Sequence, residues 1–234
     1  MQRSRRLIAS VCNSIMLYAA PIWHQAFNCV SYFGECKSAY RISSLRVCSA
    51  YRTVSYDASC VISSRVPLDI LADKVAAKWR QRGQLIPATV QQSEMLFRWQ
   101  EQWDRSPNGR WTYELIPLVD AWVNRKHGEI DFYLTQLISG HGCFRDYLHK
   151  YKHVDTPFCL FCPEKVENAR HILTECIRFD DIRSVFGPCE LSPERFINYM
   201  LQNKSNWEKA ANFAAQAMKR LRFDDEMERR RRST

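Results

Sequence analysis

Apolar residues recur every three or four positions along most of the chain, a spacing that predicts amphipathic helices. In the first half, this pattern predicts helices over residues 5–20, 35–50, 55–64, 67–82 and 89–104. Further helices are predicted over 111–124 (interrupted or entered near Pro117), 131–138, 144–152 and 206–221. Only 7 glycines are present, which argues against a loop-rich β sandwich. The expected fold class is therefore mainly α.

The strongest turn signal is the Arg-Ser-Pro-Asn-Gly sequence at 105–109, because proline, asparagine and glycine favour turns. It predicts a domain boundary that separates residues 1–104 from 105–185. Residues 186–234 are expected to add a C-terminal helix and a basic tail. Four adjacent arginines, 229–232, predict that the tail is disordered, because like charges repel.

The net charge is +9, from 34 Lys and Arg against 25 Asp and Glu. Such an excess favours a polyanionic partner, because neutralising phosphates releases condensed counterions. Acidic lipid, or no polyanion at all, stays open on charge alone. No secretory signal and no apolar run of roughly 20 residues is found, so we expect an intracellular protein with no membrane partner. The 10 cysteines then indicate metal ligands and small buried side chains more than disulfides.

Four ligand-type residues lie within 18 positions: Cys159, Cys162, His171 and Cys176 form a C-x2-C-x8-H-x4-C pattern. A tight turn can direct two cysteines in a C-x2-C pair at one tetrahedral ion, and thiolate with imidazole suits Zn²⁺. His171 and Cys176 can both face the ion only if Cys176 lies near a frayed helix end, because five residues turn a helix by about 140°. The alternative, buried cysteines with a chance histidine, fits the spacing less well. The site is expected to be structural, because protein ligands fill all four positions.

Basic residues close to this cluster are candidates for nucleic-acid binding. Three of them alternate with Tyr147 and Tyr151, and two more lie near Phe158 and Phe161 in the knuckle, a mixture typical of surfaces that pair phosphates and stack bases. These candidates are Arg145, Lys150, Lys152, Lys165 and Arg170. The same mixture occurs on ordinary amphipathic helices. The neighbouring Gly-His-Gly-Cys sequence at 140–143 is interpreted as a helix break and not as a catalytic Cys–His pair.

Two Asp-Asp pairs, at 180–181 and 224–225, resemble the paired carboxylates that hold Mg²⁺ in polymerases. Both occur in helical, charge-rich segments, and neither has the aromatic-x-Asp-Asp order of reverse transcriptases. We interpret both as solvated surface pairs, and no catalytic residue is assigned.

Five ordered blocks between residues 7 and 185 resemble LINE-type (non-LTR) reverse transcriptases, in particular the type-1 elements of insect ribosomal DNA. The blocks are LYAAPIW at 17–23, AYRTVS with VPLD at 50–69, WD with GRWT and IP at 103–117, LTQ with SGHG at 134–142, and the Cys-Cys-His-Cys cluster. The cluster departs from the shorter retroviral knuckle, since eight residues separate Cys162 from His171 and proline occupies position 163.

This resemblance implies the C-terminal part of a Pol polyprotein that nicks DNA and copies its own RNA. Residues 1–104 would form a helical thumb and post-thumb region, and 105–185 a small helical domain ending in the zinc knuckle. The implied partners are RNA, DNA and the upstream polymerase core, which alone would hold Mg²⁺, and the implied location is nuclear. The expected function is binding of template RNA or target DNA. The alternative is a zinc module for protein contacts, with helix 206–221 as its exposed interface.

Overall fold

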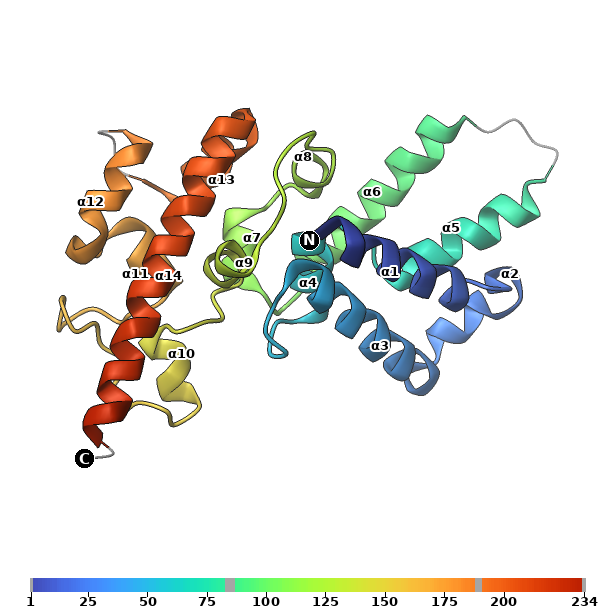
Figure 1. Cartoon of the computed structure of the whole chain (residues 1–234). Helices are drawn as coiled ribbons and strands as arrows, with labels where there is room; N and C mark the ends of the chain where they lie inside the picture. Colours follow the sequence, from blue (N-terminus) through green and yellow to red (C-terminus); the bar gives the residue numbers. More distant parts are fainter. Residues whose placement is uncertain (1, 83–86, 188–190, 233–234) are drawn as a thin grey trace. The chain divides into compact units, whose positions relative to one another are not determined.

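The computed structural model describes residues 2–82, 87–187 and 191–232 (Figure 1). The chain divides into two compact units. Unit 1 comprises Met1–Tyr113 and Pro117–Asn124, and unit 2 comprises Glu114–Ile116 and Arg125–Thr234. Every regular element in the described ranges is a helix, and the only strand-like pairing there is a single bridge between Phe158 and Val166. The prediction of a mainly α fold is confirmed.

Unit 1 is a cluster of helices that corresponds closely to the predicted periodic segments. Ser55 caps one of them, since its side chain accepts a hydrogen bond from the Ala58 amide. Pro67 precedes the next and Pro87 the one after. The elements are α1 (Gln2–Met16), α2 (Ala20–Trp23), η1 (His24–Asn28), α3 (Val30–Cys48), α4 (Tyr56–Ser63), α5 (Leu68–Arg80), α6 (Ala88–Arg105) and α8 (Val119–Val123), with α7 (Arg110–Leu115) crossing into unit 2.

The core of unit 1 forms where α3 packs on α1 and α4, while α5 packs on α2 and α6. Two buried tyrosines satisfy backbone groups inside it: the Tyr40 hydroxyl donates to the Val66 carbonyl at 2.6 Å, and the Tyr56 hydroxyl accepts from the Leu68 amide at 2.8 Å. These bonds fix the loop between α4 and α5. The fully buried side chains include Tyr40, Cys60, Val61, Ile62, Leu68, Trp99 and Trp103.

The turn at 105–109 is packed within unit 1. Gly109 has a φ of +72°, and a Cβ at this position would lie 2.9 Å from the Ala58 Cβ. The Ser106 hydroxyl donates to the Asp57 carboxylate at 2.8 Å. The two compact units divide beyond this turn, near residues 113–125.

One face of α1 and α2 exposes large apolar side chains. Its members are Leu7, Ile8, Val11, Ile15, Tyr18 and Ile22. Among the helices that the structure describes, no single one is long and apolar enough to cross a membrane. The segments Gln2–Met16 and Ala20–Phe27, with a bend of 57° between them, are long and apolar enough only when taken together.

Unit 2 is built around one long helix, α14 (Lys204–Arg232), which packs on α9 (Phe132–Ser139), α12 (Asp180–Arg183) and α13 (Pro193–Gln202). Asp131 caps α9 and Ser192 caps α13 through side-chain bonds to backbone amides. The remaining elements are α10 (Arg145–Lys150), α11 (Ala169–Thr174), η2 (Ile177–Phe179) and η3 (Ser184–Phe186).

Two expectations for the C-terminal helix were wrong. The stripe expected as an exposed interface is the core of unit 2, since Trp207, Ala210, Phe213, Ala214, Ala217 and Leu221 are all buried. The helix also continues through Arg232, where a disordered tail was expected. Asp225, one turn earlier, pairs with Arg229 and offsets part of the like charge. Glu228 pairs with Arg145, which attaches this end of the helix to the rest of unit 2.

Candidate metal centre

Residues 158–166 form a tight loop that presents the first two cysteines. The bridge between Phe158 and Val166 closes its base. Inside it, the Cys159 amide donates to the Lys165 carbonyl and the Lys165 amide to the Cys162 carbonyl, both at 2.9 Å. These bonds turn the chain within four residues, so both thiol groups point to the same side.

The other two ligand-type residues come from α11 and the turn that follows it. Asn168 begins the helix, because its side chain accepts a hydrogen bond from the His171 amide at 2.9 Å. The helix ends at Thr174, and the Cys176 amide bonds back to the His171 carbonyl at 2.8 Å. Cys176 thus lies just beyond the helix end, as the sequence required for His171 and Cys176 to face one point.

The ligand atoms of Cys159, Cys162, His171 and Cys176 all lie within 4.8 Å of one another. The Cys176 sulfur is 3.8 Å from the Cys159 sulfur and 4.0 Å from that of Cys162. A tetrahedral zinc site with Zn–S bonds of about 2.3 Å separates its sulfurs by roughly 3.8 Å. Both ring nitrogens of His171 are buried without a hydrogen-bond partner. This cluster can hold a metal ion and is compatible with structural zinc, and no other such group occurs among the described residues.

The electrostatics of the cluster favour a cation. A hydrogen bond shared by the Cys159 and Cys176 sulfurs lowers the pKa of Cys159 to about 3 and raises that of Cys176. Burial, together with the negative charge at Cys159, raises the pKa of the nearby Glu167 carboxyl to about 8. A positive ion bound by the thiolates would offset this excess of negative charge.

Two arginines that the sequence analysis did not single out support the cluster. The Arg183 guanidinium donates to the carbonyls of Ile172, Leu173 and Cys176 at 2.8–3.1 Å, which satisfies the C-terminal end of α11. Arg178 lies 4.4 Å from the centre of the Phe161 ring and forms an ion pair with Asp224 on α14. No local pattern could identify these contacts, because Asp224 lies 46 positions along the chain from Arg178.

Arg145, predicted as a nucleic-acid contact, lies in the interior of unit 2. The residue is 8% exposed, and its guanidinium bonds to Glu228 at 2.5 Å and to Thr156 at 3.4 Å. Its amide donates to the Glu167 carboxylate at 3.2 Å. The alternation of basic and aromatic residues in this segment did not distinguish an inward-facing arginine from its exposed neighbours.

We expect Arg145→Met to lower the free energy of unfolding by about 2–3 kcal/mol, because Glu228 would lose its buried partner. Chemical denaturation measures this change. Arg222→Gln serves as the control, since its pair with Glu226 is exposed to solvent and should contribute little to stability. Weaker nucleic-acid binding by Arg145→Met at unchanged stability would show that Arg145 contacts nucleic acid after all.

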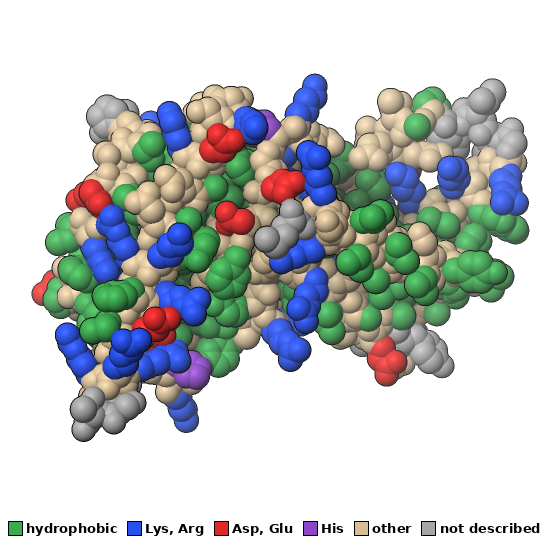
Figure 2. Space-filling model, viewed as in Figure 1, with side chains coloured by type: hydrophobic (Ala, Val, Ile, Leu, Met, Phe, Trp, Pro, Cys, Tyr) green, Lys and Arg blue, Asp and Glu red, His purple; other side chains and the backbone are tan. Residues whose placement is uncertain are grey.

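The four other predicted nucleic-acid residues are exposed. Lys165 forms an ion pair with Glu175 at 3.4 Å, and Arg170 with Glu114. Lys150 and Lys152 lie at the end of α10 and just after it. Figure 2 shows blue side chains gathered at the lower left, over α10 and the C-terminal end of α14. The exposed side chains Phe158, Leu160 and Phe161 belong to the knuckle itself.

The Asp-Asp pairs hold helices together. In the first pair, Asp181 forms an ion pair with Arg220, which connects α12 to α14, and Asp180 pairs with Arg183. In the second pair, Asp224 and Asp225 are half-buried and paired with Arg178 and Arg229, so the description of these two as solvated was wrong.

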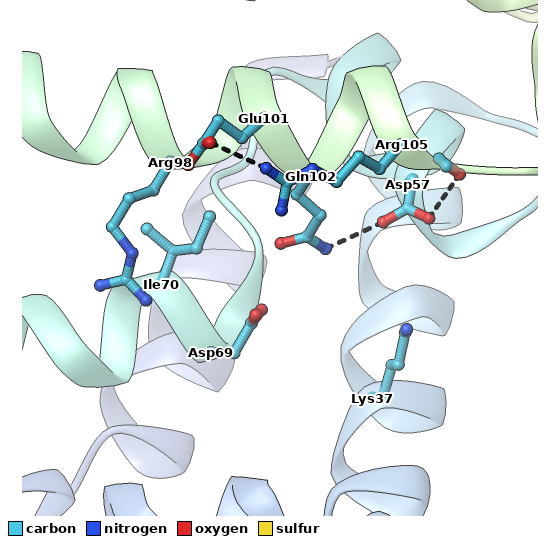
Figure 3. A pocket seen from close by; sticks show the side chains of 9 residues that line it. Lys37, Asp57, Asp69, Ile70, Arg98, Glu101, Gln102 and Arg105 are labelled. Atoms are coloured by element: carbon cyan, nitrogen blue, oxygen red, sulfur yellow. Dashed lines mark hydrogen bonds and ion pairs between the residues drawn. The ribbon is translucent and has the colours of Figure 1, made fainter.

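A separate cavity of about 480 Å³ lies in unit 1 and mixes acidic with basic side chains (Figure 3). Most of its polar groups bond to one another: Asp57 accepts from Gln102 and Ser106, and Glu101 pairs with Arg105. Its remaining carboxylate, Asp69, has a raised pKa because of burial. The described part of the cavity brings no three metal-ligating groups together.

Comparison with known proteins gives the cluster its context. The chain is 29% identical over 195 residues to the Pol polyprotein of type-1 retrotransposable element R1 from Bradysia coprophila, covering 74% of this chain and 19% of that protein. It is 27% identical over 248 aligned positions to the putative 115 kDa protein of element R1DM from Drosophila melanogaster, covering 94% of this chain and 24% of that protein. Over most of its length, the chain is therefore similar to proteins encoded by type-1 retrotransposable elements.

A further relative, the Pol polyprotein of element R1 4 from Nasonia vitripennis, is 29% identical over 160 residues, which cover 59% of this chain and 40% of that protein. The chain thus spans about a fifth to two fifths of the length of these R1 relatives. No protein-family profile matches it, and no solved structure is significantly similar.

Proposed function

We propose that this part of the R1-type polyprotein binds nucleic acid, template RNA or target DNA, while the polymerase part copies it. The observation that carries the proposal is the convergence of Cys159, Cys162, His171 and Cys176 at spacings that suit zinc, next to exposed aromatic side chains. Zinc knuckles are recurrent modules of nucleic-acid recognition. The net charge of +9 supports a polyanionic partner.

In this proposal the zinc ion is structural. The Cys3His donor set fills a tetrahedral coordination shell with protein ligands, so no position remains for a reacting water. Zinc would hold the loop 158–166 against α11 and thereby fix the positions of Phe158 and Phe161. Bases would stack on these rings, and Lys165, Arg170, Lys150 and Lys152 would pair with phosphates.

The similar proteins point to a further partner, the polymerase part of the same polyprotein. Pol polyproteins of R1 elements are longer than this chain, so we propose that it acts together with the upstream polymerase core, which would hold the Mg²⁺ ions. Insertion into chromosomal DNA would place the protein in the nucleus.

The test is binding of the zinc-loaded chain to RNA and DNA across a salt series. We expect tight binding with a steep salt slope for the wild type. The slope in question is that of the logarithm of the binding constant against the logarithm of the salt concentration. Lys150→Gln with Lys152→Gln should reduce its magnitude by about 1.4–1.8, since each phosphate contact contributes about 0.7 for single strands and 0.9 for duplex DNA. Lys204→Gln with Lys209→Gln removes the same charge from the opposite end of α14 and is the matched control.

A second variant, Cys159→Ser with Cys162→Ser, tests the knuckle directly and should weaken binding at every salt concentration. Equal, weak binding by the wild type and this variant would remove the proposed nucleic-acid-binding function from the knuckle.

One observation favours a second candidate, a zinc module that makes only protein contacts. The exposed apolar face of α1 and α2 is large enough to suggest a protein partner. Association that survives high salt, without salt-dependent nucleic-acid binding, would favour this function.

A further inference from the structure

The excess positive charge of the chain lies mainly in unit 1, away from the knuckle in the sequence. Unit 1 contains 15 Lys and Arg against 8 Asp and Glu, a net charge of +7. Unit 2 contains 19 against 17, a net charge of +2. The larger excess of positive charge makes a surface of unit 1 a second candidate for phosphate contacts.

Within unit 1, one segment concentrates this charge. Residues 74–93 contain four basic residues and no acidic one. They form the C-terminal end of α5, the beginning of α6 and the connection between them. Figure 2 shows blue side chains, and no red ones, over this end of α5 at the upper right. We call the described residues 74–82 of this segment the α5 basic end.

The exposed basic residues of the α5 basic end form a short row along the chain. Lys78 and Arg80 lie in the last turn of α5, and Arg82 lies in the turn just after the helix. All three are exposed, and none of them forms an ion pair within the ranges that the structure describes. The acidic residue nearest in sequence, Asp73, is already paired with Arg98 at 2.6 Å. This row is thus open to an external anion.

An exposed aromatic ring lies beside this row. Trp79 is 52% exposed, and the Arg82 guanidinium lies 5.6 Å from the centre of its ring. An exposed tryptophan next to unpaired cations is the combination on which unpaired bases stack while phosphates are neutralised. Bases inside a duplex cannot reach such a ring because they are stacked on one another.

We propose that the α5 basic end is a second nucleic-acid site, specific for single strands, which holds the phosphate backbone with Lys78, Arg80 and Arg82 and stacks a base on Trp79. The inference rests on the proposed nucleic-acid-binding function and assigns it a surface outside the knuckle. Recognition there is independent of sequence, because lysine and arginine contacts to phosphates do not read base edges.

The test compares the full, zinc-loaded chain with two triple variants on unstructured RNA and DNA oligonucleotides and on duplex DNA. Lys78→Gln, Arg80→Gln and Arg82→Gln should reduce the salt slope for single strands by about 2, from about 0.7 per contact. Arg6→Gln, Arg46→Gln and Arg52→Gln remove the same charge from other exposed positions of unit 1. This control variant should keep most of the salt dependence of single-strand binding. Trp79→Ala should weaken single-strand binding about tenfold or more and leave duplex binding unchanged. Thermal unfolding checks that each variant folds.

Equal losses from both triple variants would overturn the site in favour of diffuse charge. An unchanged slope in the α5 variant, with wild-type binding intact, would overturn the inference and leave the knuckle function standing. Equal losses of single-strand and duplex binding in Trp79→Ala would overturn the single-strand specificity. Absence of salt-dependent binding by the wild type would remove both the inference and the proposed function.

Discussion

Removing the metal ion should unfold the knuckle of unit 2 while leaving unit 1 folded. Structural zinc contributes apparent binding free energies of about 10–16 kcal/mol in zinc-finger peptides, because the ligands come together only in the folded state. Loop 158–166 and α11 have few other means to hold Cys159 near Cys176, since α11 is only 6 residues long. Hydrogen exchange after chelation is therefore expected to lose protection in residues 158–176 and in the helix ends that rest on them.

The two units supply internal controls for this experiment. Cys48 and Cys60 are fully buried in unit 1, outside the cluster, so amide protection around them should not change on chelation. Cys162→Ser should reproduce the effect of the chelator, whereas Cys36→Ser, at an exposed position, should not. Full protection of 158–176 after chelation, with no zinc released, would contradict a structural metal site.

Most of the long helices could be predicted from the sequence because each is encoded by a local pattern, although α13 was not predicted. The predicted segments 55–64 and 89–104 correspond to α4 and α6 within about one residue at each end. The metal cluster was predictable for the same reason: its four ligands lie within 18 positions, and their spacing reflects one turn and one short helix.

Ion pairs between residues far apart in the sequence could not be predicted. Such pairs explain why the sequence did not show the burial of Arg145 or the helical end of α14. Arg145 looked like its exposed neighbours Lys150 and Lys152, but its partner Glu228 lies 83 positions away. The same pair, with Arg178 on Asp224, holds the end of α14 against the knuckle side of unit 2 and keeps the arginine-rich end helical. A tail judged only by its own like charges therefore appeared disordered.

Gly128→Ala should be among the most destabilising single substitutions in unit 2. Gly128 has a φ of +83°, and a Cβ there would lie 2.1 Å from an atom of the Trp207 ring. Trp207 cannot move aside easily, because it is buried and its indole nitrogen donates to the Glu129 carbonyl at 3.1 Å. Left-handed backbone strain of about 1–2 kcal/mol and overpacking of about 1–3 kcal/mol together predict a loss of about 2–5 kcal/mol.

Chemical denaturation of Gly128→Ala and Gly187→Ala separates the two contributions. Gly187 also has a positive φ, +93°, with a ψ of 177°, and no described atom lies within 4 Å of a Cβ at this position. Gly187→Ala should therefore show backbone strain without overpacking, about 1–3 kcal/mol, because this backbone region is reached almost only by glycine. A larger loss at Gly128 assigns the difference to the Trp207 ring, and hence to the contact by which residues 127–129 fix the start of α14. Equal losses would mean that the ring yields, and that Trp207 does not hold this segment rigidly in place.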